Sequence, residues 1–200
     1  MPRYTIITPT ILRESLEKCC DSVNFQTVTD WEHLVILDSA DDTQTVWPEL
    51  MHPQRKFIRC GINHNDWGDT CRHLAWTHAT GEYIHYLDDD NYYPDDRVLE
   101  EFRAVTADWA IFPINKIHFG GMHFFCPPMV GGTDTGSFLV RREIGRWPKG
   151  VVSGGVQWVE TSKKYNSDGR FAKQLSEKYN YDILLTRPLM VYGGKNQEQL

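Results

Sequence analysis

The stretch Tyr83-Ile84-His85-Tyr86-Leu87-Asp88-Asp89-Asp90-Asn91 joins an apolar run to three consecutive acids. Aromatic and β-branched residues over five positions predict a buried strand from 83 to 87. The three carboxylates cannot continue into an apolar interior, because burying an unpaired carboxylate is very costly. We therefore expect them at the carboxyl end of the strand, the edge at which open α/β sheets bind ligands.

Asp88 and Asp90 are one residue apart, so they share a face of a straight strand. Such a pair can hold a hard divalent cation, and the cation can hold a diphosphate. A solvated acidic turn is the alternative interpretation, because charge runs often mark only surface. An EF-hand calcium loop is excluded: counted from Asp88, Tyr93 stands where Gly is needed and Leu99 where Glu is needed.

The rest of the chain alternates strand and helix patterns, which predicts an α/β fold with a mostly parallel sheet. Strands are expected at residues 4–7, 33–37, 57–60, 83–87, 109–114, 136–140, 183–185 and 189–192, and residues 115–136 form a loop or hairpin. Helices are expected after the turn Thr8-Pro9-Thr10, from a cap at Asp69 or Thr70, after Pro94, and after Ser167. The strand at 33–37 also ends in an acid, Asp38, on what should be the same sheet edge.

Length and charge narrow the class of protein. A chain of 200 residues suits one compact domain, and its net charge of −6 argues against a nucleic-acid partner and against a polybasic lipid anchor. No apolar run reaches the length of a membrane span, and the N-terminus does not look like a signal peptide. Five cysteines without a Cys-x-x-Cys pair indicate reduced thiols in a cytoplasmic protein.

The order of these landmarks resembles the family-2 glycosyltransferases of the GT-A fold. The matching segments are Pro9-Thr10-Ile11-Leu12-Arg13, Leu37-Asp38-Ser39, Cys71-Arg72-His73, Ala79-Thr80-Gly81-Glu82-Tyr83-Ile84 and Leu87-Asp88-Asp89-Asp90. In the family they correspond to Pro-Thr-Tyr-Asn-Arg, to an Asp that touches the base, to Ala-Arg-Asn, and to the region of the central acids. Ser167-Asp168 stands where the family usually carries Glu-Asp.

The resemblance implies a Rossmann-like, mostly parallel sheet flanked by helices in a single GT-A domain. Residues 1–92 would form the nucleotide-sugar-binding half and residues 93–200 the acceptor-binding half. The activity it implies is transfer of a sugar from a nucleotide diphosphate sugar to a hydroxyl of a glycan, a lipid-linked or a small-molecule acceptor. A UDP-sugar is favoured because an Asp accepting from a ring N–H suits uracil, and a GDP-sugar remains open.

The resemblance also implies a site. Asp90 would be the direct ligand of Mn²⁺ or Mg²⁺, Asp88 would reach the ribose or a metal-bound water, and Asp89 would hold the sugar or only shape the turn. The base would be held by Thr8, Pro9, Thr10 and Asp38. Arg72 would pair with the acids or with phosphate, unless it is an ordinary helix-surface arginine.

An inverting transfer needs a base for the proton of the acceptor hydroxyl. Asp168 is the candidate, and the helix dipole is expected to keep it ionised; its alternative role is that of a plain N-cap. His118, His123, Asp134 and Trp158 are candidate acceptor contacts.

Two other functions compete with transfer. A sugar-nucleotide pyrophosphorylase would be expected to carry a Gly-rich phosphate loop after its first strand, and Thr8-Pro9-Thr10-Ile11 contains no glycine. A non-catalytic sugar-binding module would tolerate loss of Asp90 or Asp168, and both are present.

Overall fold

The computed structural model describes the chain except for residues 42, 118–119, 124–126, 129–132, 145–166 and 194–200. In chain order its helices and strands are β1 (Tyr4–Thr10), α1 (Ser15–Asn24), β2 (Trp31–Leu37), the 3₁₀ turn η1 (Pro48–Leu50), β3 (Arg55–Arg59), α2 (Asp69–His78), β4 (Tyr83–Tyr86), β5 (Asn91–Tyr92), α3 (Val98–Phe102), β6 (Trp109–Ile111), β7 (Ile114–Lys116), β8 (Gly121–His123), the 3₁₀ turn η3 (Thr135–Ser137), β9 (Phe138–Arg141), α4 (Ser167–Lys178), β10 (Tyr181–Ile183) and β11 (Met190–Tyr192).

The large sheet has seven strands in the order β10-β6-β9-β4-β1-β2-β3. Strands β4, β1, β2 and β3 run parallel, and β9 is antiparallel to both of its neighbours, β4 and β6. A second, four-stranded sheet has the order β5-β11-β7-β8. The predicted α/β architecture with a mostly parallel sheet is confirmed.

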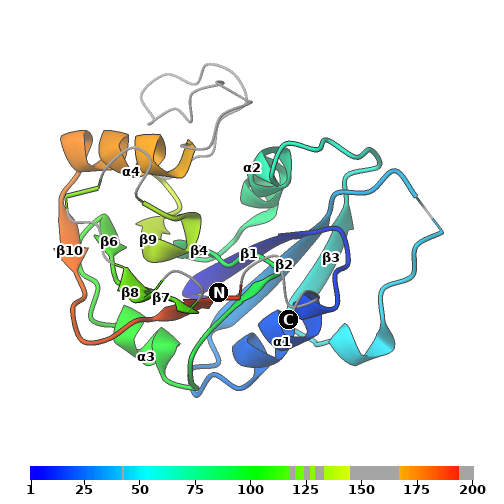
Figure 1. Cartoon of the computed structure of the whole chain (residues 1–200), viewed down its shortest axis with the longest axis horizontal. Coiled ribbons are helices and arrows are strands. Elements are labelled where there is room, and N and C mark those ends of the chain that lie inside the picture. The colour runs from blue at the N-terminus through cyan, green and yellow to red at the C-terminus, as the bar shows by residue number, and fades with distance from the viewer. Residues whose placement is uncertain (42, 118–119, 124–126, 129–132, 145–166, 194–200) are drawn as a thin grey trace.

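Helices cover both faces of the large sheet, with α2 and α4 on one face and α1 and α3 on the other (Figure 1). Strand side chains alternate between these two layers because successive residues of a strand point to opposite faces. Ile6 packs in the cluster that contains α1 and α3, and Ile7 packs in the cluster that contains α2 and α4. Both faces of β1 are therefore core, which explains why the strand reads as a continuous apolar run.

Several predicted boundaries were wrong. Strand β1 runs through Thr8-Pro9-Thr10, which was expected to be a turn, and pairs with β2 up to Leu37. The apolar run 109–114 is divided between β6 in the large sheet and β7 in the small one. Residues 91–92, for which no strand was predicted, form β5, and the loop or hairpin expected at 115–136 contains the β7–β8 pair. None of the described helices is long and apolar enough to cross a lipid bilayer.

A chain of buried hydrogen bonds crosses the four parallel strands. The Arg55 guanidinium donates to His33 Nδ1 (2.9 Å), so His33 carries its proton on Nε2 and donates it to Thr8 Oγ1 (2.9 Å). The Thr8 hydroxyl donates in turn to the carbonyl of Leu87 (2.6 Å), the residue before the three acids. Burial, with Arg55 beside it, holds the pKa of His33 well below its ordinary value, so the ring is neutral.

This arrangement predicts the effect of removing the Thr8 hydroxyl. Thr8→Val keeps the shape of the side chain but leaves the His33 N–H and the Leu87 carbonyl without a partner, which costs about 1–3 kcal/mol for each buried group. Urea unfolding followed by circular dichroism measures the free energy of unfolding. Thr8→Ser, which loses one methyl group and keeps the hydroxyl, is expected to cost about 1 kcal/mol. A valine variant as stable as the parent would contradict this role.

Candidate functional site

Asp89 is the central acid of the triplet Asp88-Asp89-Asp90, and its side chain is held inside the fold. Its side chain is buried, and its two oxygens accept hydrogen bonds from the Thr10 hydroxyl (2.7 Å) and from Arg13 Nη1 (2.8 Å). Burial still raises the pKa of Asp89, although both partners favour the ionised form. Because both carboxylate oxygens are occupied from β1 and the segment that follows it, Asp89 fixes the turn that holds its neighbours.

Of the three acids, Asp90 has the fewest described partners that offset the charge of its carboxylate. Only 9 % of its side chain is exposed, and among the described residues its nearest cation is Arg13, with Nη1 3.7 Å from Oδ2. Burial, followed by the charges of Asp88 and Asp89, raises the pKa of Asp90 to about 6. The site therefore holds excess negative charge at this carboxylate, which a bound cation would offset.

Asp88 forms an ion pair with Arg72, a buried residue of α2. Nη1 of the same arginine donates to the carbonyl of Trp67 (2.9 Å) and lies 3.5 Å from Asp69. Burial alone would lower the pKa of Arg72, but the carboxylates of Asp88, Asp69 and Asp168 hold it above its ordinary value. The interpretation of Arg72 as a surface residue was wrong; it pairs with a strand-end acid, which was its other predicted role.

Asp168 reaches this cluster from the far end of the chain. It is the second residue of α4 and is half-buried. Burial raises the pKa of Asp168 to about 7; Arg72 and a hydrogen bond from Thr135 oppose that shift, while the charges of Asp134 and Asp88 add to it. The helix dipole was expected to keep this carboxylate ionised; a pKa of about 7 leaves it only partly ionised at neutral pH, because burial and the neighbouring acids favour the protonated form.

The residues predicted to hold the base lie at the same edge of the sheet. Asp38 follows β2 and accepts hydrogen bonds at Oδ1 from the backbone N–H (2.9 Å) and from Nδ1 (2.7 Å) of His64. The Thr8 hydroxyl is fully buried and engaged within the sheet, and Thr10 is bonded to Asp89. The side chain of Pro9 contacts Gly68, where a β-carbon would lie 2.7 Å from Pro9 Cβ.

Helix α2 begins differently from the prediction. Neither Asp69 nor Thr70 is its cap: the N-cap is Gly68 in the left-handed region (φ +83°), and Asp66 accepts from the backbone N–H (3.1 Å) and the hydroxyl (2.5 Å) of Thr70. A side chain at position 68 would both collide with Pro9 and strain the backbone, so glycine is required. This tight start brings Arg72 close to β1 and the triplet.

The predicted acceptor residues are only partly described. Asp134 precedes η3, accepts from the backbone N–H of Gly136 (3.0 Å) and forms an ion pair with Lys116 (2.9 Å). His123 is half-buried on β8. His118 and Trp158 lie outside the described residues.

The segment at the end of strand β11 contacts the backbone of the triplet. Strand β11 pairs with β5, and the backbone N–H of Gly193 donates to the carbonyl of Asp90 (2.9 Å). A β-carbon at Gly193 would lie 2.0 Å from that carbonyl oxygen, so only glycine fits. The approach of residue 193 to the acids was not predicted from the sequence.

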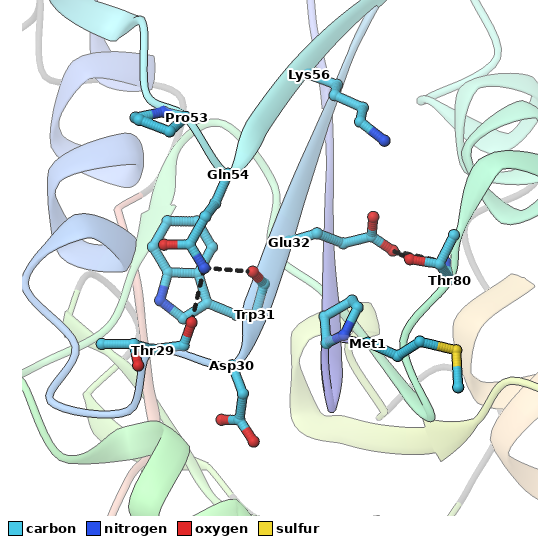
Figure 2. A pocket seen from close by; sticks show the side chains of 10 residues that line it. Met1, Thr29, Asp30, Trp31, Glu32, Pro53, Gln54, Lys56 and Thr80 are labelled. Atoms are coloured by element: carbon cyan, nitrogen blue, oxygen red, sulfur yellow. Dashed lines mark hydrogen bonds between the residues drawn. The ribbon is translucent and has the colours of Figure 1, made fainter.

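A pocket at the opposite end of the parallel strands is a poor candidate for the active site. It is lined by Trp31, Glu32, Gln54 and their neighbours (Figure 2). Glu32 accepts hydrogen bonds from Thr80, and Gln54 donates to the carbonyls of Thr29 and Trp31. Its polar groups are thus used to join strands and loops, whereas open α/β sheets bind ligands at the carboxyl ends of their strands.

Three residues of the site had no predicted role: Arg13, His64 and Thr135. Arg13 contacts both Asp89 and Asp90, and its place in Pro9-Thr10-Ile11-Leu12-Arg13 was the available signal. His64 lies in the loop between β3 and α2, and Thr135 begins the short turn η3; neither stands in a recognisable pattern, so their partners follow only from the fold.

Sequence comparison gives one family match. The model of the family described as "Glycosyl transferase family 2" matches residues 5–131, which include β1, the triplet and Arg72. A comparison with curated proteins finds no match.

Solved structures share the architecture. The crystal structure of S. aureus TarS 1–349 has a TM-score of 0.73 and 17 % identity over 96 % of this chain and 60 % of that chain. The structure of TarS 1–349 in complex with UDP-GlcNAc has a TM-score of 0.64 and 16 % identity over 99 % of this chain and 60 % of that chain. The mannosyltransferase PcManGT from Pyrobaculum calidifontis, in complex with GDP-Man and Mn²⁺, has a TM-score of 0.67 and 19 % identity over 98 % of this chain and 58 % of that chain. These similarities confirm the GT-A fold, and the chain spans 60 % or less of each of these proteins.

The buried ion pair predicts a large effect of Arg72 on stability. Arg72→Met leaves the carboxylates of Asp88 and Asp168 without their shared cation, and breaking a buried pair in this way costs about 3–5 kcal/mol. Arg72→Lys keeps the charge and is expected to lose less. Arg103→Met is the matched control, because the exposed pair of Arg103 with Asp30 (3.7 Å) contributes about 0–1 kcal/mol. Equal unfolding free energies for Arg72→Met and Arg103→Met would contradict the assignment.

Proposed function

Because the chain belongs to glycosyl transferase family 2, we propose that it transfers a sugar from a nucleotide diphosphate sugar to an acceptor hydroxyl. The observation that supports this most is that Arg72 pairs with Asp88 and lies within electrostatic reach of Asp168. One cluster therefore combines acids that can hold a cation and its diphosphate with a carboxylate that can accept a proton.

The donor set at the triplet fits a hard divalent cation, Mn²⁺ or Mg²⁺. Asp90 offers oxygen ligands, is largely desolvated, and is paired among the described residues only with Arg13, at 3.7 Å. Asp88 is paired with Arg72, so we assign Asp90 as the direct ligand and Asp88 as the group that orients Arg72 and reaches the ribose or a metal-bound water. When bound, such an ion neutralises the departing diphosphate. Asp89 shapes the turn through Thr10 and Arg13.

We place the nucleotide base beside Asp38, at the carboxyl ends of β1 and β2. Both hydrogen bonds from His64 end on Oδ1 of Asp38, so Oδ2 is the oxygen that would accept from a ring N–H. Such a contact favours uracil and hence a UDP-sugar. Pro9 and Thr10 line the same edge, while Thr8 supports it from inside the sheet.

Asp168 is assigned as the general base of an inverting transfer. A pKa near 7 suits this role, because the carboxylate is then a stronger base than an ordinary aspartate and is still partly ionised at neutral pH. Arg72 supports the ionised form and Thr135 donates to it. Asp134 and His123 belong to the half of the chain we assign to the acceptor. The free thiols of the four described cysteines support a reducing compartment, the cytoplasm.

The cation site predicts a calorimetric result. UDP is expected to bind at least about tenfold more tightly with Mn²⁺ than with a chelator, because an ion held by Asp90 would offset the charge of the diphosphate. Asp90→Asn removes the ligand charge without changing the size of the side chain and is expected to abolish this difference. Glu82→Gln, on the exposed residue before β4, is the control that keeps it.

Competition among UDP, GDP, CDP and ADP tests the base contact in the same experiment. Equal affinity for all four would reject a specific pocket at Asp38. An Asp90→Asn protein that retains metal-enhanced binding would reject the cation assignment. Assays with a panel of nucleotide sugars, with and without added pyrophosphate, separate the functions: release of nucleoside diphosphate indicates transfer, pyrophosphate-dependent release of sugar monophosphate and nucleoside triphosphate indicates a pyrophosphorylase, and no turnover indicates a binding module.

The base assignment predicts the behaviour of Asp168→Asn. Asparagine caps a helix about as well as aspartate but cannot accept the proton, so transfer should fall about 10²–10⁴-fold while donor binding stays unchanged. In the parent protein the rate should rise with pH through about 7, because the base acts only when deprotonated. Near-normal turnover of the variant would leave Asp168 as a helix cap, and retention of the anomeric configuration would exclude the single-displacement mechanism.

A further inference from the structure

Four potential metal ligands from three separate parts of the chain meet beside β2 and β3. Asp38 follows β2, Cys60 and His64 follow β3, and Cys71 lies in the first turn of α2. Each offers one ligand atom, and the four atoms lie within 4.8 Å of one another. Asp38 and Cys71 are buried, and Cys60 and His64 are half-buried. None of the four belongs to the triplet.

The distances within this group are close to those around a tetrahedral ion. Cys60 Sγ lies 3.4 Å from Cys71 Sγ, and His64 Nδ1 lies 2.7 Å from Asp38 Oδ1. Bond lengths of about 2.3 Å to sulfur and about 2.0–2.1 Å to nitrogen or oxygen place two tetrahedral ligands roughly 3.8 Å and 3.3 Å apart, respectively. These two pairs would separate by roughly 0.4 Å and 0.6 Å, and the other pairs, which lie within 4.8 Å, would draw together around the ion.

The chemistry of the donors differs from that of the triplet. Two thiolates, one imidazole and one carboxylate suit Zn²⁺, whereas the all-oxygen triplet suits Mg²⁺ or Mn²⁺. Four protein ligands leave no open position, which is typical of a structural site rather than a catalytic one.

The segment that these ligands enclose also requires a restraint. Between Cys60 and α2, Asn65 and Trp67 have positive φ angles (49° and 61°), which non-glycine residues rarely adopt. Such conformations persist only where the surrounding structure imposes them. The four ligands connect this segment at His64 to the ends of β2 and β3 and to the start of α2.

We propose that Asp38, Cys60, His64 and Cys71 bind one structural Zn²⁺ that holds the segment 61–68 against the edge of the large sheet. On binding, the two thiols release their protons and become thiolate ligands, the proton on His64 Nδ1 moves to Nε2 so that Nδ1 can bind the ion, and no bond is oxidised or reduced. Asp38 would bind zinc through one oxygen and remain available to a nucleotide through the other. This site is independent of the cation proposed at Asp90.

Metal content and cobalt spectroscopy of the full chain, purified with a reductant and without chelator, test the site. About one zinc per chain is expected by elemental analysis. Replacement by Co²⁺ should give the charge-transfer band of thiolate ligation and the strong visible bands of a tetrahedral ion. Cys60→Ser and Cys71→Ser should lower the zinc content and weaken the charge-transfer band, and chelation should reduce the melting temperature of the parent protein.

Two control variants make the result specific. Cys20→Ala removes a buried thiol of α1 outside the cluster and should leave the zinc content unchanged. Asp90→Asn should also keep its zinc while losing metal-enhanced nucleotide binding, so failure of one metal site is distinguishable from failure of the other. A metal-free protein, a cobalt spectrum without the thiolate band, or a Cys60–Cys71 disulfide in the reduced preparation would each overturn the proposal.

Discussion

Three consecutive carboxylates at the end of a buried strand need nearby donors or cations that offset their negative charge. The arrangement around the site depends on which groups do this. Each acid is treated differently: Asp89 is bonded on both oxygens, Asp88 is paired with one arginine, and Asp90 is left largely uncompensated. The groups that offset these charges come from the end of β1, the segment after it and α2, so the acids that follow β4 require these segments to lie close to them. The acid without a full partner is the one with capacity for a cation.

Buried hydrogen bonds and one close backbone contact fix the conformation of the chain at this edge of the sheet. The hydrogen bonds from Arg55 through His33 and Thr8 to Leu87 connect four parallel strands and end one residue before the acids. Gly193 contacts the carbonyl of Asp90 so closely that no side chain fits there. A site that depends on carboxylate positions is thus supported both from within the sheet and from the C-terminal strand, which is what pre-organisation of a charged site requires.

Much of this was predictable from local sequence, and the reasons for the failures are physical. The apolar run before Asp88 and the acid after β2 indicated that two strands end at one edge of the sheet. This was possible because the length of an apolar run and the position of a charge can be read directly from the sequence. The end of β1 was predicted too early because the residues Thr8-Pro9-Thr10 are typical of turns. In the fold, the neighbouring strands provide the hydrogen-bond partners of this segment. The pKa of Asp168 could not be inferred from its position in a helix, since it depends on burial and on the charges of Arg72 and Asp134, which are distant in the sequence. Asp38, Cys60, His64 and Cys71 match no spacing pattern, and only the fold brings them together.

Asp90 and Asp168 show how one cluster can provide two carboxylates with different tasks. Both have raised pKa values because burial disfavours their charge, but the neighbours differ: Asp90 is surrounded mainly by other acids, whereas Asp168 has Arg72 and the Thr135 hydroxyl beside it. A cation at Asp90 would lower the pKa of this carboxylate and offset part of the negative charge of the three acids. Arg72 connects the two carboxylates because it contacts the triplet through Asp88 and stabilises the ionised form of Asp168.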